Sequence, residues 1–409
     1  MTKKALFIVY SFPPSGGPGV QRPTKFVKYL PEFGWQAIVL TTTPEAYPVL
    51  DETLLSDIPP NTPVYRQKSY DVRALRPTFE RLNMGKVLSG INTALQLPDA
   101  AIFWARFARK RVQHVIAEHQ PDIIFSSSPP ASAHLLARWA HHECDIPWVA
   151  DFRDPWSQNP LHPYPPGYQT LNRWLENKVL TDADSVTTVS PPIVKMLQTL
   201  SGCKEVVHLL ENGYDEDVVR HPPPNTRQFT ITYTGEFSPL RRPDALVQAV
   251  VQLVESGRIP ASEFRLRFAG KNPPKYIPYR LPFQQLGYLS HQELNDIRRD
   301  SDVLLLLLSN SPAARGNYTG KLFEYLASNR PILTISRPDN VAAQLVKQAR
   351  AGRVVPHDSD QIAETIEVMY RAWKMKRFEH APDWELISQF SRRNLTQRLA
   401  GIFDSLLSD

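Results

Sequence analysis

The chain has 409 residues, 42% of them hydrophobic and 22% charged, which suits a soluble protein of two domains rather than one. A formal net charge of +6 favours anionic ligands such as phosphates, nucleotides or acidic lipids, and no zinc spacing or RNP-type motif points to nucleic acid. Two cysteines, Cys144 and Cys203, fit neither a disulfide framework nor a metal site, which indicates a cytoplasmic protein. The apolar runs Ala5–Tyr10 and Val303–Leu308 are too short for a signal peptide or a membrane span.

In the first half of the chain, short apolar segments alternate with longer amphipathic ones, as in βα units on a parallel sheet. The expected strands are Ala5–Tyr10, Ala37–Thr41, Asp122–Ser126, Trp148–Asp151, Ser185–Val189 and Val206–Leu210. The clearest helical patterns are Arg22–Leu30, Ala101–His119 and Ala131–His142. Because ligands bind at the carboxyl ends of parallel strands, the polar residues after each strand are candidate site residues.

The second half repeats this alternation after a stiff, proline-rich connector at His221–Asn225. The expected strands are Phe229–Tyr233, Phe264–Phe268, Val303–Leu308 and Pro331–Ile335, and the expected helices are Pro243–Glu255, Ser290–Asp300 and Lys321–Ala327. The sequence therefore predicts an α/β protein with two Rossmann-like domains, residues 1–217 and 218–384, and a C-terminal helical segment, residues 385–409.

A glycine-rich loop, which includes Gly16 and Gly17, follows the first strand and precedes a helix. Glycines let a backbone approach a ligand closely, and a helix start attracts phosphate. The dinucleotide fingerprint fails, because Arg22 stands where its third glycine would fall and Thr41 to Thr43 replace the acidic residue after the second strand. A phosphate-binding loop and a mere tight turn both remain open.

The sharper phosphate candidate is the start of the helix that follows the strand Val303–Leu308. Tyr318 and Thr319 precede the helix, Gly320 and Lys321 open it, and Glu324 lies one turn further on. Thr319 is a good N-cap residue, and free N–H groups beside a lysine attract a diphosphate. The alternative is an exposed Lys–Glu pair of no functional consequence.

A third phosphate candidate follows the first strand of the second half. Gly235 ends that strand, and Arg241 and Arg242 begin the next helical turn. Arginine has donor geometry that matches phosphate oxygens. Two solvated surface arginines are the alternative interpretation.

Polar and aromatic residues after the strand Trp148–Asp151 are candidates for binding sugar hydroxyls and a ring face: Asp151, Arg153, Asp154 and Trp156. An Asp–Arg pair that merely fixes the loop is an equal alternative. His134, one turn into a neighbouring helix, is a further candidate, although packed helical histidines are more common.

The helix Ala101–His119 interleaves aromatic and basic residues, a pattern that suits an anionic membrane surface. The residues concerned are Phe103, Trp104, Phe107, Arg106, Arg109, Lys110 and Arg111. The simpler and favoured interpretation is an amphipathic helix whose apolar side packs on the sheet.

Taken in order, these motifs resemble the retaining GT-B glycosyltransferases of family four over nearly the whole chain. The resemblance rests on Gly16-Gly17, Asp151–Trp156, Glu211–Asp215, Thr234–Phe237, Gly287–Leu289 and the helix that carries Lys321 and Glu324. It implies two facing Rossmann-like domains, with a last helix that crosses back to the N-terminal domain.

The resemblance also implies roles for single residues. Glu324 would bind the ribose hydroxyls and the backbone of Thr319–Lys321 the diphosphate, while Arg242, or alternatively Arg241, would replace the family's phosphate-binding lysine. The segment that would meet the base consists of Gly287, Tyr288 and Leu289. Two departures, Glu236 for an arginine and Asn317 for a glutamate, weaken inference about the sugar.

The implied reaction moves a sugar from a nucleotide diphosphate sugar to an acceptor hydroxyl, with retention and without a metal or other cofactor. Arg242 and Lys321 would stabilise the leaving diphosphate, and Asp154 is the candidate base if one is used. The acceptor is expected to be a glycan or lipid-linked glycan of a surface polysaccharide, with peripheral contact to the inner face of an anionic membrane as a further hypothesis. A nucleotide-sugar epimerase and a non-catalytic nucleotide-sugar-binding subunit remain as alternatives.

Overall fold

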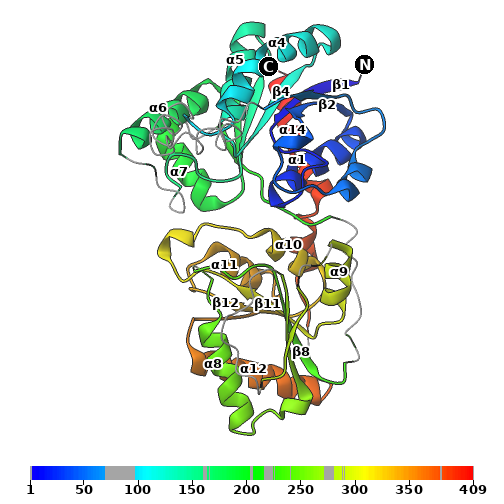
Figure 1. Cartoon of the computed structure of the whole chain (residues 1–409), viewed down its shortest axis with the longest axis vertical. Coiled ribbons are helices and arrows are strands. Elements are labelled where there is room, and N and C mark those ends of the chain that lie inside the picture. The colour runs from blue at the N-terminus through cyan, green and yellow to red at the C-terminus, as the bar shows by residue number, and fades with distance from the viewer. Residues whose placement is uncertain are drawn as a thin grey trace, which may run out of the picture. The chain divides into compact units, whose positions relative to one another are not determined.

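The computed structural model describes residues 2–69, 97–159, 164, 166–202, 206–215, 224, 226–239, 241–270, 281–287, 289, 291–377 and 380–408. The chain divides into two compact α/β units (Figure 1). The first consists of Met1–Asn212 together with Arg392–Asp409, and the second of Gly213–Ser391.

The first unit is built on a seven-stranded sheet in the order β3-β2-β1-β4-β5-β6-β7, with every neighbouring pair parallel. Its strands are β1 (Lys3–Val9), β2 (Trp35–Thr42), β3 (Val64–Gln67), β4 (Ile123–Ser128), β5 (Trp148–Phe152), β6 (Ser185–Thr188) and β7 (Val207–Leu209). Its helices are α1 (Pro18–Tyr29), α4 (Ile102–His119), α5 (Ser132–Cys144), α6 (Pro166–Asp182), α7 (Pro191–Ser201) and α14 (Arg392–Leu406). Two apolar clusters pack against this sheet, as the near-continuous apolar runs of doubly covered strands require.

The second unit repeats the design with six parallel strands in the order β10-β9-β8-β11-β12-β13. Its strands are β8 (Phe229–Thr234), β9 (Phe264–Ala269), β10 (Phe283–Gln285), β11 (Val303–Leu307), β12 (Ile332–Ile335) and β13 (Gly352–Val355). Its helices are α8 (Asp244–Glu255), α9 (His291–Arg299), α10 (Gly320–Ala327), α11 (Val341–Gln348), α12 (Ser359–Lys374) and α13 (Trp384–Ser388). The predicted fold class, two Rossmann-like domains of parallel strands and helices, is confirmed.

The C-terminal helical segment contains two helices rather than the single continuous one expected from Trp384 onward. Helix α13 belongs to the second unit, where Ile387 packs in the core and the N–H of Tyr214 donates to the carbonyl of Phe390 at 3.1 Å. Helix α14 packs on α1 in the first unit, and its Phe403 ring meets Trp35 at 5.1 Å between centroids. The chain therefore passes between the units after Asn212 and after Ser391, against predicted boundaries at 217/218 and 384/385.

Candidate functional site

Glycines join the loops that follow β8, β9 and β10 at the carboxyl edge of the second sheet. The N–H of Gly235 donates to the carbonyl of Ala269, and the N–H of Gly270 to the carbonyl of Gly287, each at 2.7 Å. Gly235 has φ +128° and Gly270 has φ +152°, and a Cβ on Gly270 would lie 2.1 Å from the carbonyl oxygen of Gly235. Only glycine permits so close an approach between the backbones at Gly235 and Gly270.

Lys321, in the first turn of α10, fills the space that Gly235 leaves open. A Cβ on Gly235 would lie 2.1 Å from Lys321 Nζ, and that nitrogen lies 4.2 Å from the centroid of the Tyr233 ring. The ammonium is buried and has no hydrogen-bond partner among the described residues. Burial, with the positive charge of Arg241 second, lowers the pKa of Lys321 to about 7. A buried lysine that lacks an acceptor is suited to receive an anion.

Glu324, one turn further along α10, forms an ion pair with Arg298 of α9. The distance between Arg298 Nη2 and Glu324 Oε2 is 2.5 Å, and the side chains are 3% and 25% exposed. Sequence analysis missed Arg298, although one signal was present. Arg298 lies four residues after Leu294, on the stripe of α9 that faces the protein, where a cation is unusual.

The start of α10 is an N-terminus whose cap makes no side-chain hydrogen bond. Thr319 has the extended backbone of an N-cap residue, as predicted, but its Oγ1 is buried without a partner among the described residues. Tyr318 packs edge-on against Phe323 at 5.6 Å. The preceding loop is fixed by Asn340, whose amide donates to the carbonyl of Ala314 at 3.1 Å. The exposed Gly320 and the buried Lys321 ammonium thus stand at a fixed, positively polarised helix end.

The two arginines after β8 occupy different environments. The side chain of Arg242 is 71% exposed and bonds to Asp244 at 2.7 Å. Arg241 is half-buried; its charge adds to the effect of burial in lowering the pKa of Lys321, and it opposes the effect of burial, which raises the pKa of Tyr233. The geometry therefore favours Arg241 over Arg242 as the cation that acts together with Lys321. Of the segment predicted to meet the base, Gly287 has φ +70°, Leu289 is half-buried, and Tyr288 lies outside the described residues.

In the first unit, the Gly16-Gly17 loop is a tight turn that packs on the segment after β2. The N–H of Gly16 donates to the carbonyl of Val49 at 2.8 Å, and a Cβ on Gly16 would lie 3.0 Å from Val49 Cγ1. Gly17 has φ +94° and precedes α1 as its N-cap residue. These contacts explain both glycines without a ligand, and the phosphate role stays a prediction.

Asp151 is fully buried and its carboxylate is occupied by groups of the protein. Arg22 bonds to both carboxylate oxygens, at 2.8 Å in its shortest contact, and the hydroxyls of Ser127 and Thr187 each donate at 2.7 Å. Burial alone would raise the pKa of Asp151, but these partners, Arg22 foremost, lower it. Asp151 therefore holds the fold together rather than offering its oxygens to an acceptor. An Asp–Arg pair is present, as the alternative had it, but the arginine is Arg22.

Arg153 and Asp154 follow β5 and differ in exposure. Arg153 donates to three backbone carbonyls, those of Gly19, Ser128 and Pro129, and so ties together the loops after β1, β4 and β5. Asp154 is exposed. Among the five residues proposed for the acceptor, Asp154 is the one whose carboxylate faces solvent.

Trp156 and His134 are core residues. Trp156 is 5% exposed and its Nε1 donates to Asn172 Oδ1 at 2.7 Å. His134 is fully buried, with Nδ1 2.8 Å from Ser126 Oγ and its ring 4.5 Å from that of Phe152. Burial lowers the pKa of His134 to about 3. Both side chains are buried, and Nε2 of His134 has no hydrogen-bond partner among the described residues, so their acceptor roles stay predictions.

Helix α4 buries one side and exposes the other. Trp104 is fully buried, whereas Phe107 is 55% exposed among the exposed basic residues Arg106, Arg109, Lys110 and Arg111. No described helix is both long and apolar enough to span a bilayer. The described residues also contain no cluster of three or more His, Cys, Asp or Glu that could hold a metal ion.

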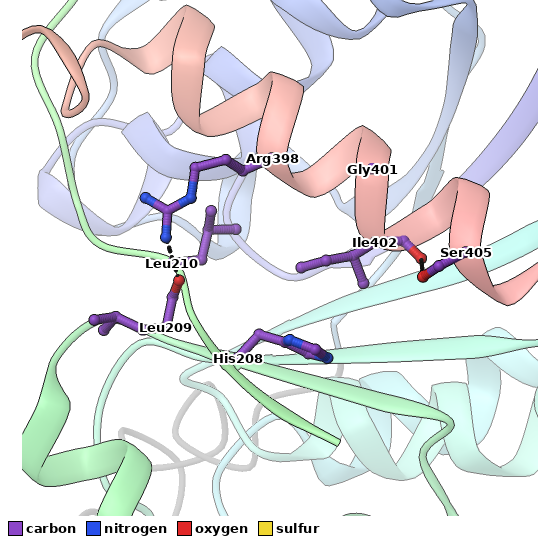
Figure 2. Close-up of a pocket in the computed structure, with 7 residues that line it drawn as sticks. All are labelled: His208, Leu209, Leu210, Arg398, Gly401, Ile402 and Ser405. Carbon is purple, nitrogen blue, oxygen red and sulfur yellow. Dashed lines mark hydrogen bonds between the residues drawn. The ribbon is translucent and has the colours of Figure 1, made fainter. Parts of the chain in front are cut away.

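A shallow pocket of about 350 Å³ lies between β7 and α14 in the first unit (Figure 2). Arg398 crosses its rim, where Nη2 donates to the carbonyl of Leu209 at 2.5 Å and Nη1 pairs with Glu211 at 2.9 Å. Because these bonds stay within the unit, they anchor α14 to the segment that leaves the sheet. No residue of the predicted site lines this pocket.

A known protein family matches the first of the two units. The family described as "Glycosyl transferase 4-like domain" matches residues 16–213, most of the first unit. No curated protein sequence matches the chain.

Solved structures share the fold of the whole chain at low identity. Sucrose-phosphate synthase from Thermosynechococcus elongatus matches with a TM-score of 0.66 and 14% identity, covering 100% of both chains. HepE from Anabaena, in complex with UDP-glucose, matches with a TM-score of 0.64 and 16% identity over 98% of this chain and 99% of that one. A putative UDP-N-acetylglucosamine 2-epimerase from Listeria monocytogenes matches with a TM-score of 0.58 and 13% identity over 100% and 97%. The predicted resemblance to glycosyltransferases of family four is thus confirmed over residues 16–213 by the family match, and the solved structures show that the whole chain shares their fold.

Proposed function

We propose that the chain is a metal-independent glycosyltransferase that moves a sugar from a nucleotide diphosphate sugar to an acceptor hydroxyl with retention. The observation that carries the proposal is the buried ammonium of Lys321 at the start of α10, one turn before Glu324, for which the described part of the chain offers no hydrogen-bond partner. An anion at this helix end would restore the hydrogen bonds that Lys321 lacks. The similarity to HepE, whose structure holds UDP-glucose, supports a nucleotide-sugar donor and makes uridine the first base to test.

The diphosphate is the group whose charge must be stabilised. As the bond between the anomeric carbon and the β-phosphate oxygen breaks, its electron pair moves to the diphosphate. Lys321, Arg241 and the N–H groups that open α10 supply positive charge at that point, so the proposal needs no metal ion. Arg242, which is 71% exposed, is a less suitable partner than Arg241.

Retention follows if the acceptor oxygen attacks from the face that the diphosphate leaves. The acceptor oxygen then bonds to the anomeric carbon, and its proton passes to the departing phosphate oxygen. No protein base is required by this route, and Asp154 is the exposed carboxylate available if one is used. Glu324 would bind the ribose hydroxyls, and the segment Gly287–Leu289 the base.

The acceptor is proposed to be a glycan or a lipid-linked glycan, with the protein in the cytoplasm. Phe107 and the basic residues of α4 form the surface that would contact an anionic membrane. Flotation with liposomes of anionic and of neutral lipid tests this part. Equal recovery with both lipids, or none with either, would remove the membrane from the proposal.

Donor binding is tested by thermal shift with nucleotide diphosphates and nucleotide sugars, with and without EDTA. One donor class should stabilise the wild type, Lys321→Met and Glu324→Gln should abolish the effect, and EDTA should leave it unchanged. Lys347→Met is the matched control, because Lys347 is an exposed lysine on α11 of the same unit. Absence of stabilisation by every nucleotide would refute the proposal.

An epimerase is the second candidate, since the Listeria monocytogenes structure titled as an epimerase shares the fold over the full chain. The two activities differ in what they consume. An epimerase converts the donor to an isomer without an acceptor, whereas a transferase releases nucleoside diphosphate in step with glycosylated acceptor. Donor binding with neither product across a panel of acceptors would point to a non-catalytic subunit.

A further inference from the structure

Arg298 is a buried cation placed against the residue that is proposed to bind ribose. Its side chain is 3% exposed, and Nη2 lies 2.5 Å from Glu324 Oε2. Its second nitrogen, Nη1, donates to Asn295 Oδ1 at 2.8 Å, while Nε is buried without a partner among the described residues. Burial of a guanidinium is costly unless it is paired, so Arg298 depends on Glu324 to stay in place.

Arg330, a second buried arginine of the same unit, has a structural role and serves as the comparison for Arg298. It is 2% exposed and donates to the backbone carbonyls of Arg299 and Asn329. Those bonds fix the chain without involving a side chain of the candidate site. Arg298 instead directs its guanidinium to a side chain, and the same charge acts on Lys321 beside it.

The contact between Arg298 and Glu324 restricts the rotation of the carboxylate. Glu324 is on the first turns of α10 and its side chain is 25% exposed, so one part of it meets solvent while Oε2 is held from α9. A carboxylate that is fixed in this way can accept hydrogen bonds from two vicinal hydroxyls in a single geometry. A carboxylate that rotates freely would lose conformational entropy when it binds the same hydroxyls.

We propose that Arg298 is a positioning residue that orients Glu324 toward the ribose diol and so makes the site select ribonucleotides over 2′-deoxyribonucleotides. This inference rests on the proposed donor site. Arg298 itself touches neither the diphosphate nor the sugar. Its loss is therefore expected to change the discrimination between the two pentoses, whereas the effect of its charge on Lys321 is the same for a ribonucleotide and a 2′-deoxyribonucleotide.

The test measures the affinity of the full chain for uridine, guanosine and adenosine diphosphates and for their 2′-deoxy counterparts by calorimetry. For the base that binds best, the wild type should prefer the ribonucleotide by about tenfold or more. The 2′-deoxyribonucleotide lacks the 2′-hydroxyl and so loses a charge-assisted hydrogen bond to Glu324. Arg298→Met should reduce this ratio to about one to threefold by weakening only the ribonucleotide. Lys321→Met should weaken both nucleotides equally and keep the ratio.

Two controls separate positioning from loss of folding. Arg330→Met removes another buried arginine of the same unit and should lower the melting temperature without changing the ratio. In a Glu324→Gln background, Arg298→Met should have no further effect on the ratio, because its target is already altered. If Arg298→Met does not fold, Arg298→Lys decides the same point, since an ammonium lacks the planar fork and should lower the ratio at least about threefold.

An unchanged ratio in the folded Arg298 variant, or an equal loss for both nucleotides, would overturn the inference while donor binding stands. Failure of the wild type to bind any of the six nucleotides would instead overturn the proposed function on which the inference rests.

Discussion

The lowered pKa of Lys321 makes the affinity for the donor depend on pH. In the free protein the pKa is about 7, because the ammonium is buried and faces Arg241. A bound diphosphate favours the charged form and raises that pKa. The protein must therefore take up a proton when it binds donor above pH 7, and affinity must fall as pH rises.

The magnitude follows from the free-protein pKa. Below pH 7 most of the lysine is already charged, and above it the affinity falls about tenfold per pH unit. Between pH 6 and pH 8.5 the dissociation constant should rise by about thirtyfold, provided that the pKa in the complex stays above this range. A nucleotide sugar is the correct probe, because its diphosphate has no ionisation of its own between these limits.

Calorimetry in buffers of different ionisation enthalpy measures both the dissociation constant of the donor and the number of protons taken up on binding. Proton uptake should approach one per donor bound at pH 8 and fall to about a tenth at pH 6. Lys321→Arg should remove the pH dependence, since arginine stays charged throughout. The exposed-lysine control, Lys347→Met, should keep it. A wild-type dissociation constant that is flat from pH 6 to 8.5 would refute the assignment of Lys321 to the diphosphate.

Four further outcomes are expected from the same contacts. Lys321→Met should raise the free energy of unfolding of the free protein at pH 7 by about 1–3 kcal/mol, as measured by urea unfolding. The folded-state pKa of Lys321 is lowered, so the native lysine destabilises the fold at every pH below its unfolded pKa. The stabilisation by Lys321→Met should therefore shrink as the pH rises from about 7 to about 10.5. Gly235→Ala should weaken donor binding at least about tenfold, because its Cβ would lie 2.1 Å from Lys321 Nζ, whereas Gly257→Ala, also at positive φ but with nothing within 4 Å, should leave binding unchanged. Asp151→Asn should lower the free energy of unfolding by about 3–5 kcal/mol by leaving Arg22 buried without its charge partner, with a smaller loss when Arg22→Met is added. Turnover should be unchanged after EDTA treatment, and a return of activity on adding Mg²⁺ would contradict the metal-free mechanism.

The fold was predictable because its signals are local. Apolar runs of strand length separated by amphipathic segments recur through both halves, and the strands from β1 to β12 that were expected appear within a few residues of their predicted bounds. Some of the elements that were not predicted have weaker patterns. Strands β3, β10 and β13 are short and half-exposed edge strands, and α6 follows a proline-rich stretch that suggested a loop.

The helix start at Thr319 to Glu324, which is proposed as the donor end, was predictable because its residues are contiguous in the sequence. The ion pair between Glu324 and Arg298 was not predictable from the sequence, because Arg298 lies 26 residues earlier and meets Glu324 only in the folded unit. For Asp151, one of the residues proposed for the acceptor, the sequence indicated the position in the fold but not the burial or the partner. Asp151 was placed correctly at a strand end, but its burial depends on Arg22, 129 residues away.

Two carboxylates that each pair with a buried arginine, Asp151 and Glu324, differ in the other groups around them. Both carboxylates stand near the carboxyl edge of a parallel sheet, and both meet an arginine that is at most 3% exposed. Around Asp151, hydroxyl donors from β4 and β6 complete the coordination, so nothing is left for a ligand to satisfy. Beside Glu324, the ammonium of Lys321 is buried and has no hydrogen-bond acceptor among the residues that the structure describes. Because a sequence names the charged residues but not their hydrogen-bond partners, only the structure could distinguish the fully coordinated carboxylate of Asp151 from that of Glu324, beside which an anion is proposed to bind.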